Sequence, residues 1–178
     1  MAARDNHYVR VRLAELRDAS RLAEAHVRSW QAAYVGLLPQ PLLDDLDLAE
    51  STSKWEATLG NSGSLNQVTL VAEQDGELVG FVHVRPSQDA ISDEVGEVVA
   101  MYVAPSSWRI GVGRHLMTAA LNRLVEFGLT HAVLWVLSSN ERAIRFYEAT
   151  GWLADGASKS DTVGGALVVE IRMARPLP

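Results

Sequence analysis

The sequence predicts an α+β fold in which helices flank a mixed, mostly antiparallel central sheet. Its patterns follow the order strand, helix, helix, a run of antiparallel strands, and then strand, helix, strand, helix, strand, strand. Two apolar strand patterns, Val68–Glu73 and Leu78–Arg85, are joined by an Asp75-Gly76 turn, which is typical of a tight hairpin. This order differs from the regular alternation of strands and helices in a doubly wound dinucleotide fold.

The first half of the chain is predicted to contain one short strand and a helical region before the hairpin. Tyr8–Leu13 alternates like a strand. Leu16–Tyr34 has apolar side chains three and four residues apart, which indicates a helix that ends before Gly36. Leu42–Leu59 is also predicted to be helical, in one piece or in two, and the polar residues 60–66 are predicted to form a loop.

The second half is predicted to alternate strands and helices before a final pair of strands. Asn140 has the residue type of a helix N-cap, and Gly151 that of a left-handed C-cap. The predicted elements are strands at Val95–Val103 and His131–Leu137, helices at Leu116–Phe127 and Asn140–Thr150, a strand that begins at Trp152, and a last strand at Leu167–Met173.

Length and composition favour a single domain over residues 1–178 and exclude several functional classes. The chain has no cysteine, which excludes disulfides, thiolate metal sites and a cysteine nucleophile. Its formal net charge of −6 argues against a nucleic-acid surface. No apolar run approaches the roughly 20 residues that span a bilayer, and the charged start lacks a secretory-signal pattern. We therefore expect a cytoplasmic protein with no metal, nucleic-acid or membrane partner.

The most informative segment is Pro105-Ser-Ser-Trp-Arg-Ile-Gly-Val-Gly-Arg114, which lies between a predicted strand and a predicted helix. A helix N-terminus carries about half a positive charge, and glycines let a ligand approach the backbone closely. The segment therefore predicts a phosphate-binding site. It lacks both the three-glycine dinucleotide fingerprint and a Walker lysine-serine pair, so the loop alone does not identify the phosphate compound.

A second segment, Asn140-Glu-Arg-Ala143-Ile-Arg-Phe146-Tyr147-Glu-Ala-Thr-Gly151-Trp152, follows roughly 30 residues later. Together the two segments resemble the motifs of the GNAT superfamily of acyl-CoA-dependent N-acetyltransferases. The family's helix pattern, Asn-x-x-Ala-x-x-Phe-Tyr-x-x-x-Gly-Phe/Trp, is present in full. In its loop pattern, Arg/Gln-x-x-Gly-x-Gly/Ala, both glycines match, but Trp108 stands where Arg or Gln is usual and Arg109 follows it.

The resemblance implies a GNAT-like sheet and acetyl-CoA as the cosubstrate. Backbone amides from Ile110 to Arg114 would hold the pyrophosphate, and arginine side chains would add charge. A splay between the strand before the loop and the next strand would expose backbone groups to the pantetheine arm. The implied cofactor-binding residues are Met101, Tyr102, Val103, Arg109, Ile110, Gly111, Val112, Gly113, Arg114, Asn140 and Ala143.

The resemblance also implies catalytic residues. Tyr147 matches the family's general acid, and a phenol with an ordinary pKa of about 10 stays protonated at neutral pH. Glu97 corresponds to a basic glutamate in several members, although a solvated strand-end carboxylate is the alternative. His83, acting through a water, is a second candidate base, unless it is only hydrogen-bonded within the sheet. Trp30 and Tyr34 either pack in the core or line the acceptor site.

The first functional hypothesis is transfer of an acetyl group from acetyl-CoA to a primary amine of a small molecule or peptide by direct attack. A non-catalytic CoA- or acyl-CoA-binding sensor module is the alternative, and it would need neither Tyr147 nor Glu97. A third hypothesis is an acyltransferase that uses a longer acyl chain or an aminoglycoside-like acceptor. The loop residues Asp89, Asp93 and Glu94 would attract a cationic acceptor or simply be solvated. The last strand, Leu167–Met173, is expected at a sheet edge where a second copy would pair to form a homodimer.

Overall fold

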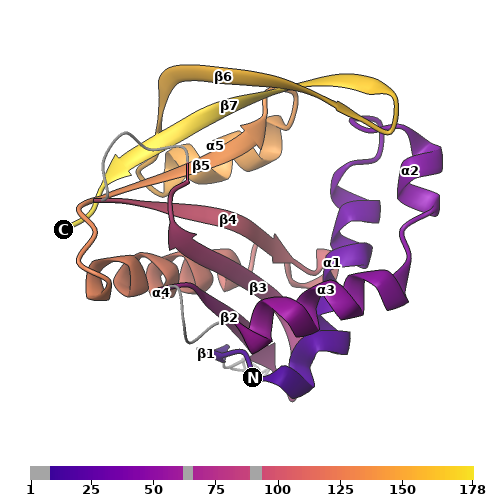
Figure 1. Cartoon of the computed structure of the whole chain (residues 1–178), viewed down its shortest axis with the longest axis horizontal. Helices are drawn as coiled ribbons and strands as arrows, with labels where there is room; N and C mark the ends of the chain where they lie inside the picture. Colours follow the sequence, from indigo (N-terminus) through magenta and orange to yellow (C-terminus); the bar gives the residue numbers. More distant parts are fainter. Residues whose placement is uncertain (1–8, 62–65, 89–93) are drawn as a thin grey trace, which may run out of the picture.

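The computed structural model describes residues 9–61, 66–88 and 94–178. A seven-stranded sheet in the order β1-β2-β3-β4-β5-β7-β6 forms its centre, with β1 and β6 at opposite edges (Figure 1). Only the β4–β5 pair of this sheet is parallel, so the predicted mixed, mostly antiparallel sheet is confirmed. The strands are β1 (Arg10–Leu13), β2 (Val68–Gln74), β3 (Glu77–Pro86), β4 (Val95–Val103), β5 (His131–Leu137), β6 (Leu153–Val163) and β7 (Ala166–Pro176).

The predicted helical regions are present, and Leu42–Leu59 takes the two-piece form of the two that the sequence left open. The predicted helix over Leu16–Tyr34 begins as a 3₁₀ turn, and the region Leu42–Leu59 divides into two helices because Asp47 caps a new one by accepting a hydrogen bond from the Glu50 amide. The helices are η1 (Leu16–Asp18), α1 (Ala19–Ala33), α2 (Gln40–Asp44), α3 (Leu48–Gly60), η2 (Pro105–Ser107), α4 (Val112–Glu126) and α5 (Glu141–Ala149). None of them is long and apolar enough to cross a membrane.

The predicted hairpin between β2 and β3 is confirmed. Asp75 and Gly76 both have positive φ angles, 53° and 83°, as a two-residue turn of the right twist requires. The boundaries of β4 and β5 match the predicted strands residue for residue. Both strands are dominated by β-branched and apolar residues, which favour the half-buried pleated backbone of a sheet.

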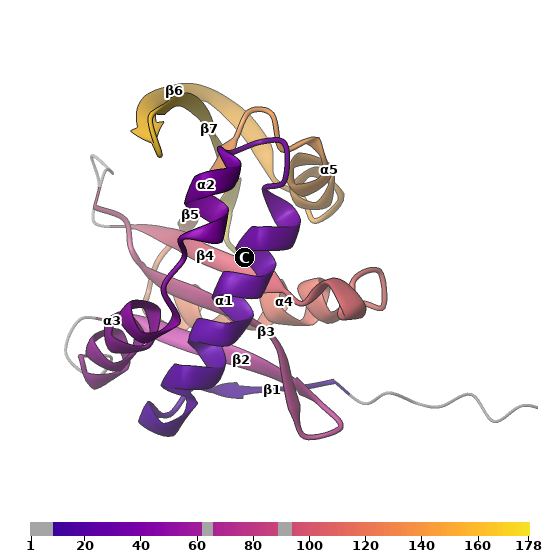
Figure 2. The ribbon, with the colours of Figure 1, turned by 90° about the vertical axis from the view of Figure 1, so that its right-hand side faces the viewer.

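Two separate apolar clusters hold the helices to opposite faces of the sheet. Helix α4 packs through Leu116 and Leu124 against β-strand side chains such as Val82 and Val98. Helix α1 packs with α3 against the other face, around Phe81. Figure 2 shows α1 crossing the strands with α3 beside it. Burial of each such side chain contributes about 1.5–3 kcal/mol relative to exposure, so both faces of the central strands are stabilised.

The prediction that Leu167–Met173 forms a sheet edge is wrong. Strand β7 pairs with β5 on one side and with β6 on the other, so it lies inside the sheet. The chain turns back at Gly164 and Gly165, and the earlier strand β6 takes the outer position. A second copy of the chain has no access to the backbone of β7 for strand pairing.

Candidate active site

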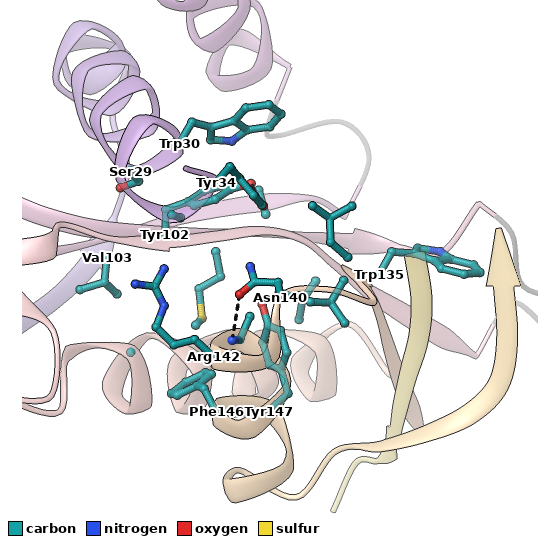
Figure 3. Close-up of a pocket in the computed structure, with 18 of the residues that line it drawn as sticks. Ser29, Trp30, Tyr34, Tyr102, Val103, Trp135, Asn140, Arg142, Phe146 and Tyr147 are labelled. Atoms are coloured by element: carbon teal, nitrogen blue, oxygen red, sulfur yellow. Dashed lines mark hydrogen bonds between the residues drawn. The ribbon is translucent and has the colours of Figure 1, made fainter. Parts of the chain in front are cut away.

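A cavity opens where β4 and β5 separate. The two strands pair only over Val95–Glu97 and His131–Val133, and they diverge beyond these residues. The predicted splay between the strands is therefore present. The cavity has a volume of about 910 Å³, and its lining comes from α1, β4, the loop before α4, β5, α5 and the β6–β7 hairpin (Figure 3).

A bulge in β4 adds to this opening. His83 pairs with Ala100 and Val84 pairs with Val98, so Val99 is an extra residue between two pairs of the β3–β4 ladder. Val99 is 40% exposed and lines the cavity. The bulge bends β4 away from the straight path that would keep it paired with β5.

The loop before α4 turns the backbone sharply so that the helix begins at the cavity. Arg109 and Gly111 have positive φ angles of 64° and 96°, and Gly111 is the residue before the first helical one. The amides of Arg114 and His115 both donate to the Gly111 carbonyl oxygen, at 3.0 and 3.1 Å. The amides that precede Arg114 have no acceptor within the helix, so they are the donors that this N-terminus offers to an anion.

Gly113 lets α4 approach α5 closely. A Cβ atom built on this residue would lie 3.2 Å from two ring carbons of Phe146, which is tighter than ordinary van der Waals contact. The glycine is therefore required for helix packing as well as for exposure of the loop backbone. The two sequence motifs meet at this contact.

Helix α5 and its N-cap residue supply several side chains to the cavity, and Asn140 and Tyr147 are two of them. The Asn140 side chain caps the helix by accepting a hydrogen bond from the Ala143 amide at 3.2 Å, as predicted. Tyr147 points from the helix into the cavity (Figure 3). Burial, with a smaller effect of nearby Tyr34, raises the pKa of the Tyr147 hydroxyl, so this group is protonated at neutral pH.

An aromatic wall from α1 and β4 closes another side of the cavity. Tyr34 and Tyr102 form a hydroxyl–hydroxyl hydrogen bond of 3.2 Å, and the Trp30 ring stands edge-on to Tyr34 with centroids 5.0 Å apart. Trp30 and Tyr34 also pack against Leu38, Leu43 and Val168. Trp30 and Tyr34 therefore both pack in the core and line the cavity, and their role at an acceptor site stays a prediction.

Most of the residues predicted for the site converge on this cavity. Two predicted cofactor residues, Ile110 and Val112, do not line it: Ile110 is half-exposed, and Val112, the first residue of α4, is buried in the core. The predicted residues that do line it are Trp30, Tyr34, Met101, Tyr102, Val103, Arg109, Gly111, Gly113, Arg114, Asn140, Ala143 and Tyr147.

Of the residues that the structure describes, none of those predicted to act as the general base, or to attract a cationic acceptor through charge, lines the cavity. Glu97 is buried in the paired part of β4, where its carboxylate lies 3.2 Å from the Arg85 guanidinium, and it does not line the cavity. His83 is buried beside the Thr69 hydroxyl, 2.9 Å away, and burial lowers its pKa to about 4. Glu94 is exposed and accepts a hydrogen bond from the Thr130 hydroxyl, whereas Asp89 and Asp93 lie outside the described residues.

Sequence reasoning missed several residues that line the cavity. Arg142 lies within the second motif but between its matching positions, so the pattern did not single it out. Trp135, Asp161 and Glu170 come from β5 and the β6–β7 hairpin, and no local pattern places them at a site. Across the ranges that the structure covers, no three acidic or histidine side chains are grouped to hold a metal ion.

Comparison with known proteins gives one consistent family. The model of the acetyltransferase (GNAT) family matches residues 19–152. An uncharacterized N-acetyltransferase of Bacillus subtilis, YuaI, is 31% identical over 141 residues, which is 79% of this chain and 78% of the relative. A mycothiol acetyltransferase of Acidimicrobium ferrooxidans is 36% identical over 86 residues, 48% of this chain but only 28% of the relative.

Solved structures agree on the fold. The PaiA N-acetyltransferase of Thermoplasma acidophilum, in complex with coenzyme A, has a TM-score of 0.75 at 22% identity, with 95% of this chain and 99% of that chain covered. The yncA protein of Salmonella typhimurium, with acetyl-CoA, has a TM-score of 0.73 at 19% identity, with 96% and 95% covered. Since the family match spans most of the chain and the fold agrees with it, this protein belongs to the GNAT family of acetyltransferases.

Proposed function

We propose that this protein transfers the acetyl group of acetyl-CoA to a primary amine of a small molecule or peptide. The observation that carries the proposal is a single cavity that joins an anion-binding helix N-terminus, an unpaired strand edge and the Tyr147 hydroxyl. These three features match the three parts of the donor: its phosphates, its amide-rich arm and its thioester.

The residues at the cavity mouth fit coenzyme A. The first amides of α4 and the side chains of Arg109 and Arg114 would supply hydrogen-bond donors and positive charge for the pyrophosphate. The pantetheine arm carries peptide-like amides, which would bond to the part of β4 from Val98 to Val103 that has lost its β5 partner. The thioester would then lie near Tyr147.

The chemistry requires one proton donor and one route for a proton to leave. The amine nitrogen forms a bond to the thioester carbonyl carbon, and the carbon–sulfur bond breaks. The ammonium form of the acceptor loses one proton to solvent before attack. Tyr147 donates a proton to the departing sulfur, and the proton that the nitrogen loses as the amide forms returns through solvent to the Tyr147 oxygen. Because burial keeps the Tyr147 phenol protonated, it is available as the acid at neutral pH.

Part of the cavity lining favours a positively charged acceptor. Asp161 from β6 and Glu170 from β7 add carboxylates to the lining, and Glu170 also forms an ion pair with Lys159 at 3.4 Å. An alkyl amine is almost wholly protonated at neutral pH, so acidic side chains would attract it to this part. The aromatic wall of Trp30, Tyr34 and Tyr102 adds faces on which a cation or an apolar stem packs.

The test is release of free thiol from acetyl-CoA in the presence of an amine panel that includes polyamines, amino acids, aminoglycosides and short peptides. Mass spectrometry of the acceptor identifies the acetylated product. Arylalkyl and aliphatic amines of equal charge separate the contribution of the aromatic wall. Tyr147→Phe, which keeps the ring, is the matched control variant.

Two results would contradict the proposal in different ways. Failure of the folded protein to bind CoA by calorimetry would remove the cosubstrate and with it the whole proposal. Suppose instead that the protein binds acetyl-CoA, that no amine causes thiol release, and that Tyr147→Phe binds and behaves like wild type in the thiol assay. This result would support the sensor module.

A further inference from the structure

A contact between Trp108 and Arg142 spans the mouth of the cavity. The guanidinium carbon of Arg142 lies 3.8 Å from the centroid of the Trp108 ring, which is close for a cation–π contact. Trp108 belongs to the loop before α4, and Arg142 belongs to the first turn of α5. Both residues line the cavity, so the contact joins its two walls.

Trp108 is anchored from below. Its indole N–H donates a hydrogen bond of 2.7 Å to the carbonyl oxygen of Val103, the last residue of β4. This bond fixes the ring at the end of the strand and leaves a ring face for the guanidinium. Trp108 is also the position where the loop departs from the Arg or Gln of the family pattern. The loop therefore has an aromatic ring, on which a guanidinium can pack, in place of a polar side chain.

Arg142 brings a positive charge to that ring. Within the described ranges no carboxylate lies within ion-pair distance of it, whereas Arg145, one turn further along the same helix, pairs with Glu141 at 3.0 Å. Figure 3 shows the Arg142 side chain reaching from α5 toward the end of β4 at Val103. Its free charge therefore faces the same mouth that the α4 N-terminus faces.

We propose that Arg142 binds the pyrophosphate of the acyl-CoA and that Trp108 is a positioning residue that holds the guanidinium for this contact. The proposal rests on the proposed function, because it assumes the same cosubstrate. A guanidinium stacked on a ring keeps its N–H edge free in the plane, where it can donate two parallel hydrogen bonds to a phosphate. The pyrophosphate would then be gripped by the α4 amides on one side and by α5 on the other.

The test is calorimetry with three ligands: CoA, 3′-dephospho-CoA, which lacks only the 3′-phosphate, and pantetheine, which lacks the pyrophosphate together with the nucleotide's adenosine and 3′-phosphate. For Arg142→Gln we expect affinity for CoA and for 3′-dephospho-CoA to fall equally, by about 10- to 100-fold, the scale of a charged hydrogen bond. Because salt screens a charge contact, the loss should shrink as ionic strength rises. Arg145→Gln, on the same helix and already paired with Glu141, is the matched control and should change affinity less than twofold.

Turnover kinetics replace calorimetry for pantetheine, which should bind too weakly for a titration. With S-acetyl-pantetheine as donor, Arg142→Gln should turn over at the wild-type rate, because that donor has no pyrophosphate. Trp108→Leu should weaken CoA binding by several-fold, and Arg142→Gln added to Trp108→Leu should cost less than it does alone. Trp108→Phe keeps a ring face but loses the bond to Val103, so it should lie between wild type and Trp108→Leu.

The outcomes are distinguishable from failure of the proposed function. If wild type binds CoA and Arg142→Gln binds it equally well, the role of Arg142 is refuted while the cosubstrate stands. A loss confined to CoA, with 3′-dephospho-CoA unaffected, would overturn the pyrophosphate assignment. An equal loss with S-acetyl-pantetheine would show that the substitution only damages the cavity. Additive losses in the double variant would overturn the positioning role of Trp108.

Discussion

The hydroxyl oxygens of Tyr34 and Tyr102 lie 3.2 Å apart, so a hydrogen bond joins the end of α1 to β4 at the wall of the cavity. Burial raises the pKa of both phenols, most strongly that of Tyr102, so both hydroxyls are neutral over the ordinary pH range. Tyr102 also stacks on His26, with ring centroids 5.2 Å apart. The bond therefore ties the predicted acceptor wall to the strand that would carry the donor.

Tyr34→Phe should weaken this wall without affecting the cofactor end. The loss of one neutral hydrogen bond should lower the free energy of unfolding by about 1 kcal/mol and raise KM for the amine by several-fold, with the Kd for CoA unchanged. Denaturant unfolding, amine kinetics and calorimetry measure the three quantities. Because the two hydroxyls act together, Tyr102→Phe should give a similar loss and the double variant little more. Fully additive losses would show that the pair is not coupled.

Tyr147→Phe should lower kcat by up to about 10²-fold while the Kd for CoA stays within about twofold, because only the acid is removed. The raised pKa of Tyr147 keeps its proton to higher pH than the ordinary value of about 10. The wild-type rate should therefore show no fall from loss of this acid up to pH 9.5 in a profile of kcat against pH. An alkaline fall below pH 9.5 that disappears in Tyr147→Phe would contradict the raised pKa of Tyr147, whereas an unchanged kcat in Tyr147→Phe would contradict its role as the acid.

Glu97→Gln tests the predicted base directly. A base role requires a large fall in kcat and loss of the acidic limb of the pH–rate profile. A structural role requires a fall in melting temperature that Arg85→Gln reproduces, since the two side chains form one part-buried ion pair at 3.2 Å. Because the Glu97 carboxylate does not line the cavity, we expect the second result, with kcat within a few-fold of wild type.

The parts of this molecule that local chemistry determines were predictable. The bounds of β4 and β5, the Asp75-Gly76 turn and the Asn140 cap each depend on a few adjacent residues, and all were found from the sequence. The bulge at Val99 was not, because an extra residue becomes visible only when β4 is aligned with β3. The order of β6 and β7 was missed for the same reason: either strand satisfies its own pattern at the edge.

In the candidate active site, too, features set by adjacent residues were predicted and features set by long-range packing were not. The glycine loop and Tyr147 were identified through motifs, whose spacing along the chain reflects one turn and one helix face. The positions of Asp161 and Glu170 depend on how the β6–β7 hairpin curves toward α2, where Gly164 lies against Leu42 (Figure 1). Glu97 was predicted as the base because it begins the strand that leads to the acetyl site and corresponds to a glutamate in the family, but the splay begins only beyond it. Long-range geometry, which the local pattern does not encode, decided each of these positions.

Replacement of Arg12 should lower the free energy of unfolding more than replacement of an exposed arginine. Its guanidinium bonds to both carboxylate oxygens of Asp18, at 2.6 and 2.9 Å, and to Glu73 at 2.6 Å, and the Asp18 side chain is only 2% exposed. Arg12→Ala would leave that buried carboxylate without its main partner, so we expect a loss of about 3 kcal/mol in denaturant unfolding. Arg17→Ala, at an exposed arginine paired with Glu15, is the control and should cost less than about 0.5 kcal/mol.

Two buried histidines should make the fold sensitive to mild acid. Burial lowers the pKa of both His26 and His83 to about 4, with smaller effects of the charges on Lys54 and Arg85. An unfolded histidine has a pKa of about 6.5, so between pH 6.5 and 4 the unfolded chain binds more protons than the folded one. Stability from these residues is therefore complete above about pH 6.5 and falls as the pH drops toward 4.

The change in the free energy of unfolding with pH tests this prediction. Each such histidine contributes up to about 1.4 kcal/mol per pH unit within this range, so the free energy of unfolding should fall steeply between pH 6 and 5. His83→Gln cannot take up the proton, so it should remove one histidine's share of that slope, although it also weakens the contact with Thr69 at every pH. The difference between pH 8 and pH 5, measured by urea unfolding for both proteins, cancels the constant cost. An unchanged difference would mean that His83 takes up its proton at the same pH in the folded and unfolded chains, and the lowered pKa of the buried imidazole would have to be abandoned.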